Sequence, residues 1–135
     1  MTALALLFDT GCFVLIWLVQ LIIYPGFQYY HPNHLKTWHS KYTKRVTLVV
    51  LPLMLGQLIL GTVQVASFHL LDLLKFGLIL TTWLVTFVIF IPLHNKIATI
   101  EETRQVTNAL VKKNWLRTGL WSLIFILSVL KHFIL

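Results

Sequence analysis

Long stretches without a charged residue constrain this chain more than any other feature. No Asp, Glu, Lys or Arg occurs at positions 10–35, 46–71 or 76–95. A helix needs roughly 20 apolar residues to cross a bilayer, and each stretch is long enough. A fourth, shorter stretch ends at Lys131, whose ammonium can reach the interface from near a helix end. The pattern predicts four membrane spans, at about 3–24, 46–66, 72–93 and 115–135.

The predicted fold is therefore all-α: a polytopic membrane protein built as an antiparallel four-transmembrane-helix bundle. Residues 1–135 leave room for this one domain only. Charged residues make up 11% of the chain, whereas a soluble domain has about 25%, so a water-soluble globule is excluded. Nothing basic precedes Lys36 and no cleavage site follows the first span, so we expect that span to be retained rather than removed as a signal peptide.

The basic residues predict how the chain is oriented. Of the 11 Lys and Arg residues, all but Lys75 and Lys131 lie in or beside the first and third connections. This bias predicts that loops 25–45 and 94–114 are cytoplasmic and that both termini are outside. We expect a bacterial cytoplasmic (inner) membrane, with the lipid bilayer as partner. The net charge of +7 indicates contact with anionic lipid headgroups rather than with nucleic acid, because most of the basic residues lie at the predicted cytoplasmic end of the bundle.

Each predicted span keeps its polar groups mostly on one helical face, which should turn toward the bundle interior because lipid penalises polar side chains. Asp9 either reaches the outer headgroups or is buried, and Asp72 and Lys75 are spaced to pair with each other on the helix surface. The simplest role of the polar groups is hydrogen bonding between helices. The faces comprise Asp9, Phe13, Ile16 and Gln20; His39, Val46, Val50, Leu53, Gln57 and Gln64; Trp83, Phe87, Phe90 and His94; and Asn114, Trp121, Phe125, Ser128 and His132.

A second cluster gathers at the cytoplasmic ends of the spans, where all four helices bring hydrogen-bonding groups to one depth. The interiors of helix bundles commonly hold cofactors and substrates. We expect Tyr42 and Arg117 to act as catalytic residues, and the cofactor-binding residues to be His39, His94, Arg45 and Asn114.

Two ligands suit this cluster. One is haem b, with His39 and His94 as axial ligands and an arginine on the propionates. The other is a quinone or another aromatic substrate, with His and Tyr moving protons. The histidines can instead simply cap helices. A metal held by His31, His34 and His39 is disfavoured because no carboxylate lies near them, so no metal site is predicted.

Three function classes remain open. The first is a small redox or aromatic-ligand protein, which leaves open whether the chain is an enzyme. The second is a non-catalytic subunit of a larger membrane complex, or a homo-oligomer, whose apolar faces meet partner helices. The third is a small transporter, which would need polar groups through the whole bilayer, whereas they thin out at 46–55 and 84–91.

The chain also resembles known membrane proteins. The similarity to a group of uncharacterised four-helix bacterial membrane proteins is carried by Tyr24-Pro25, Trp38-His39 with Tyr42 and Arg45, Pro52-Leu53-Met54 with Gln57, Trp83 with Thr86, Pro92-Leu93-His94, and Asn114-Trp115-Leu116-Arg117-Thr118 with Trp121. That group has no established activity to carry over.

More distantly, the layout resembles the anthrone-oxygenase-like membrane family. The resemblance implies four spans and a polycyclic aromatic substrate handled without an obvious cofactor. The chain departs from that family's pattern at three positions. His94 stands where the family has Asn, and Gly119 and Ser122 stand where it has His and Arg.

Overall fold

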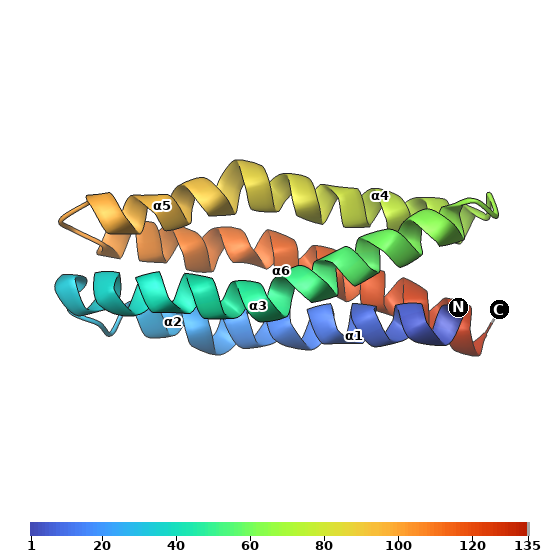
Figure 1. Cartoon of the computed structure of the whole chain (residues 1–135), viewed down its shortest axis with the longest axis horizontal. Helices are drawn as coiled ribbons and strands as arrows, with labels where there is room; N and C mark the ends of the chain where they lie inside the picture. Colours follow the sequence, from blue (N-terminus) through green and yellow to red (C-terminus); the bar gives the residue numbers. More distant parts are fainter. Residues whose placement is uncertain (135) are drawn as a thin grey trace.

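The computed structural model describes residues 1–134, and every regular element in that range is a helix. Four long rods run antiparallel and side by side, and both termini lie at one end (Figure 1). Each rod is long and apolar enough to cross a membrane. The predicted all-α four-helix bundle is confirmed, and the chain is a multi-pass integral membrane protein. The rods are α1 (Thr2–Leu18), η1 (Val19–Ile23) and α2 (Tyr24–Phe27); α3 (Pro32–Val65); α4 (Leu70–Val85), η2 (Thr86–Phe90) and α5 (Ile91–Thr99); and α6 (Arg104–Phe133).

The four predicted spans fall on the four rods, but two rods begin earlier than their apolar segments. α3 starts at Pro32 and α6 at Arg104, so both extend as polar helix beyond the apolar stretch at the basic end of the bundle. Residue 135, the end of the last predicted span, lies outside the described residues. The carboxylate of Glu102 accepts a hydrogen bond of 2.9 Å from the backbone N–H of Arg104, the first residue of α6.

Two π-helical turns, η1 and η2, interrupt the first and third rods. A π-helical turn carries an extra residue and therefore rotates the side chains that follow it. Phe87 was predicted to face the interior together with Trp83 and Phe90. It is 56% exposed, whereas Phe90 is 1% exposed, so the prediction for Phe87 is wrong. The turn gives the inner position to Phe90, beside the candidate site described below.

Close approach between α1 and α3 depends on a glycine. A Cβ added at Gly56 would lie 2.2 Å from a ring carbon of Phe8, so the Phe8 ring occupies the space that any larger residue would need. α3 continues through Pro52 and changes direction near its middle (Figure 1). Proline removes one backbone hydrogen bond and is a usual cause of such a bend.

The half of the bundle nearest the termini holds a buried ion pair. Lys75 Nζ donates to Asp9 Oδ2 at 3.2 Å, and Ser128 donates to the same oxygen. Gln57 donates to Asp9 Oδ1 at 2.7 Å and accepts from the indole N–H of Trp121 at 3.1 Å. Asp9 is 1% exposed, so it is part of the core and does not reach the headgroups.

The expected pairing of Asp72 with Lys75 is wrong. Asp72 pairs with Lys131, and Lys75 pairs with Asp9. Asp72 and Lys75 are both buried, so α4 turns this face toward α1 and α6 and each charge meets a neighbour across the bundle. Contacts between helices, which local spacing does not reveal, decide these partners.

Candidate functional site

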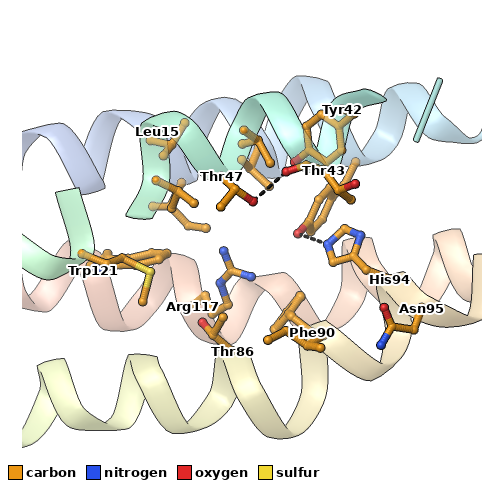
Figure 2. A pocket seen from close by; sticks show the side chains of 17 residues that line it. Leu15, Tyr42, Thr43, Thr47, Thr86, Phe90, His94, Asn95, Arg117 and Trp121 are labelled. Atoms are coloured by element: carbon orange, nitrogen blue, oxygen red, sulfur yellow. Dashed lines mark hydrogen bonds between the residues drawn. The ribbon is translucent and has the colours of Figure 1, made fainter. Parts of the chain in front are cut away.

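A cavity of about 250 Å³ lies inside the bundle. It lies between the buried ion pair and the end of the bundle that carries the connections 28–31 and 100–103, which we call the loop end. All four rods contribute to its wall, which is largely apolar. The cavity lies between α3 on one side and η2 with α5 on the other, and α6 carries Arg117 into it (Figure 2). Its polar and aromatic wall residues are Tyr24, Tyr42, Thr43, Thr47, Thr86, Phe90, His94, Asn95, Arg117 and Trp121.

Among residues 1–134, Arg117 is the only charged side chain in the cavity wall. Its guanidinium carbon lies 4.2 Å from the ring centroid of Phe90 and 5.2 Å from that of Trp121. The residue is 7% exposed, and its buried Nε has no hydrogen-bond partner among residues 1–134. The salt bridges of the described chain are Lys75–Asp9 and Lys131–Asp72, so no carboxylate neutralises Arg117.

A chain of three hydrogen-bonded side chains leads from the cavity toward the loop end. The hydroxyl of Tyr24 shares a hydrogen bond of 2.9 Å with Nε2 of His94. Nδ1 of His94 shares one of 2.7 Å with Nε2 of His39. Each imidazole carries one proton when neutral, so the chain has two arrangements: Tyr24 donates to His94 and His94 to His39, or the reverse. To pass from the first arrangement to the second, Tyr24 must take up a proton and Nδ1 of His39 must release one, while one proton shifts along each of the two bonds.

The six predicted site residues do not all meet. Tyr42 and His94 line the cavity with Arg117, and His39 lies directly behind His94. Arg45 is exposed on α3 and is not part of the wall.

Asn114 is buried but also lies outside the cavity wall. Its amide donates to the Oε1 atom of Gln20 at 3.0 Å, and Thr118 donates to the same oxygen at 3.2 Å. The Gln20 amide in turn donates to the carbonyl of Val111 at 3.2 Å. These bonds hold the first rod against α6, so Asn114 serves packing between helices in this arrangement.

The histidine pair does not fit bis-histidine haem. A metal–imidazole bond is about 2 Å long, so two nitrogens on opposite sides of one iron lie about 4 Å apart. The facing nitrogens of His39 and His94 are 2.7 Å apart and their rings are stacked with centroids at 5.0 Å. Neither an iron nor a macrocycle has room between them. His31 and His34 contact each other, and the described residues contain no group of three metal-ligating side chains.

Sequence reasoning placed Phe90 on an inward face without a site role. It placed Tyr24 at the inner end of the first span, near that span's polar face and among the hydrogen-bonding groups of the cytoplasmic cluster, but not among the predicted catalytic or cofactor-binding residues. Phe90 becomes part of the site through η2, which no sequence signal predicted. Tyr24 lies one helical turn beyond Gln20, and both are 2% exposed. Because residues four apart lie on the same side of a helix, this spacing was a signal that the hydroxyl of Tyr24 faces the interior together with Gln20.

The comparisons with known proteins add no relative. No protein-family model, no curated protein and no solved structure matches the chain. The resemblances described above therefore stay predictions, and the chemistry of the site rests on its geometry.

Proposed function

We propose that this protein binds a small amphiphilic molecule in the cavity around Arg117, at the cytoplasmic side of the membrane. Arg117 holds an oxygen of the molecule's polar end, and the chain of Tyr24, His94 and His39 exchanges a proton with that end. The observation that carries the proposal is the buried guanidinium, which faces a largely apolar cavity without a counter-ion.

The donor inventory supports this role for Arg117. A guanidinium has five N–H donors and no acceptor, and its buried Nε has no hydrogen-bond partner in the described chain. Phe90 and Trp121 offer the cation only their ring faces, and cation–π contacts supply about 0.5–2 kcal/mol. Because an unsatisfied buried donor costs about 1–3 kcal/mol, and more when charged, a ligand oxygen would relieve a real deficit.

The same proposal includes the membrane in which the protein lies and its orientation there. The cavity lies toward the connections that carry most of the basic residues. Basic loops stay in the cytoplasm, so the cavity opens in the inner half of a bacterial cytoplasmic membrane and both termini face out. The ligand then reaches the site from the inner leaflet or the cytoplasm.

A quinone or another aromatic molecule is one ligand of this kind. Its carbonyl oxygens would accept from Arg117, and its ring would pack against Trp121 and Phe90. The distant resemblance to the anthrone-oxygenase-like family points to the same ligand class. The proposed function comprises binding of this molecule and exchange of a proton with it.

The test is to fill the cavity. Val50 lines the cavity, whereas Leu48 lies on the same helix and is 77% exposed. The wild-type protein is extracted in nanodiscs together with lipid from the membrane in which it was expressed, and is then released for native mass spectrometry. We expect the spectrum to show a bound small molecule. That molecule should be lost in Val50→Trp and kept in the matched control Leu48→Trp.

An identical set of bound species in both variants and the wild type would refute the proposal. A protein that carries no small molecule but co-purifies with another membrane protein, and loses that partner in Leu48→Trp, would instead support the complex-subunit hypothesis.

A further inference from the structure

We infer that the ligand of this cavity is a monoanionic amphiphile with one apolar tail, such as a fatty-acid carboxylate. The inference rests on the proposed function and deepens it by fixing the charge of the ligand and the position of its tail. It follows from the charges inside the bundle, the occupied threonine hydroxyls of the wall and the place where the wall opens.

The charges inside the bundle do not balance. The buried charged residues of the described chain are Asp9, Asp72, Lys75 and Arg117. Lys75 neutralises Asp9, and Lys131 neutralises Asp72. The hydrogen bond between His39 and His94 needs an unprotonated nitrogen on one of the two rings. With neutral histidines, Arg117 leaves one positive charge in excess. A neutral carbonyl could satisfy its donors but not its charge, whereas one anion satisfies both.

Among the described wall residues, Arg117 is the one cationic partner for this anion, and the hydroxyl of Tyr42 and the amide of Asn95 are neutral donors beside it. The hydroxyls of Thr43, Thr47 and Thr86 donate to backbone carbonyls of their own helices, at 3.1, 2.6 and 2.8 Å. Their protons are therefore already in use. A single guanidinium matches a carboxylate, whose two oxygens accept two parallel N–H bonds. A phosphate monoester carries about 1.5–2 negative charges at neutral pH and would leave part of its charge unpaired.

The tail has a place outside the cavity. A drug-sized ligand needs about 300–1,000 Å³, and this cavity has about 250 Å³. The wall includes the exposed residues Thr47 on α3 and Ile91 on α5. The cavity therefore opens sideways between these helices, toward lipid.

This side opening is bounded along the bundle. His39 and His94 join α3 to α5 at the loop end. At the other end, the space beside Gly61 of α3 is filled by Phe76 and Ile79 of α4. A polar head at Arg117 would thus leave its tail between the two helices and in the inner leaflet.

The test compares three uncharged or anionic probes of similar length: dodecanoic acid, dodecanol and a decyl-substituted benzoquinone. Each competes with a fluorescent fatty acid for the protein in nanodiscs of zwitterionic lipid, with empty nanodiscs as the blank. We expect the wild type to bind dodecanoate at least ten-fold more tightly than dodecanol or the quinone. Arg117→Met should reduce that preference to about one, and Arg117→Lys should keep most of it. Arg45→Met, which removes an exposed cation, should leave the preference unchanged.

The outcomes separate the inference from the proposed function. Equal binding of all three probes, lost in Val50→Trp, would overturn the anion and leave the proposed function standing. A preference for dodecanoate that survives in Arg117→Met would also overturn it. No binding by any probe to the folded wild type would count against both. If Arg117→Met fails to fold, the wild-type ratio of acid to alcohol decides alone.

The position of the tail has its own readout. Dodecanoic acid with a diazirine in mid-chain should, after irradiation, label α3 near Thr47 or α5 near Ile91. Label confined to the outer faces of α1 or α4 would contradict the side opening.

Discussion

Nε2 of His39 lies 2.7 Å from Nδ1 of His94, a hydrogen-bond distance that leaves no room for a metal between the rings. We therefore expect the protein purified in mild detergent to have no haem spectrum that depends on these two residues. The measurement is the visible absorption spectrum, air-oxidised and then dithionite-reduced. A Soret band that shifts on reduction and disappears in His39→Ala or His94→Ala would contradict this arrangement of the pair.

The ion pair of Lys75 and Asp9 predicts strong coupling between two substitutions. Because each change alone leaves a buried charge without its partner, Asp9→Leu or Lys75→Met should cost about 3–5 kcal/mol of unfolding free energy. The double variant Asp9→Leu with Lys75→Met should lose only about 1–2 kcal/mol, since the amide of Gln57 then lacks one acceptor. Reversible unfolding in mixed micelles measures all three values. Additive losses in the double variant would mean that the two charges do not interact.

The charge pattern predicted the fold because it reports how deep a segment can lie in lipid. Most of each charge-free stretch lies within one rod. The pattern carries no information on where a helix ends outside the lipid, since polar residues are equally stable there as helix or loop. The predicted spans therefore leave out the polar first parts of α3, which begins at Pro32, and of α6, which begins at Arg104.

The candidate site was predictable in depth but not in its contacts. Helical spacing placed His39 and His94 on inward faces and Arg117 beside one, all at one depth. In the structure His94 and Arg117 line the cavity, and His39 lies behind His94. Their partners depended on rotation of whole helices, which spacing does not fix. The same rotation removed Arg45 from the site and gave Asn114 to Gln20. Of the two phenylalanines predicted to face inward, Phe90 is buried and Phe87 is turned outward at η2, and no residue type in that turn indicated it.

The contact between α1 and α3 predicts opposite effects of alanine at two glycines. A Cβ at Gly56 would lie 2.2 Å from the Phe8 ring, whereas a Cβ at Gly119 would have nothing within 4 Å. Gly56→Ala should cost about 1–3 kcal/mol through overpacking. Gly119→Ala should be neutral or stabilising by up to about 1 kcal/mol, because alanine has the higher helix propensity. Phe8→Ala added to Gly56→Ala should restore part of the loss. Similar effects of alanine at both glycines, measured in the same unfolding assay, would show that Phe8 does not limit the approach.

The basic connections predict the direction of insertion. Cys12, the one native cysteine, is 1% exposed and can be replaced by alanine to give a clean background. Single cysteines at the exposed positions Asn33 and Glu101 should react with a membrane-impermeant maleimide only after the cells are opened. A cysteine at His69, at the other end of the bundle, should react in intact cells. The reverse labelling pattern would place the cavity in the outer leaflet.

The unpaired Arg117 predicts that removing a charge stabilises the empty protein. A cation buried without a partner raises the free energy of the folded state by several kcal/mol, even after relaxation of its surroundings. Phe90 and Trp121 return only part of this through their ring faces. After exhaustive delipidation, the unfolding free energy of Arg117→Met should therefore exceed that of the wild type by about 1–3 kcal/mol. Dodecanoate should then raise the unfolding midpoint of the wild type more than that of Arg117→Met, because tighter ligand binding stabilises the folded form more. A loss of stability in delipidated Arg117→Met, with Arg45→Met unaffected, would mean that the guanidinium is structural and that its neighbours already satisfy it.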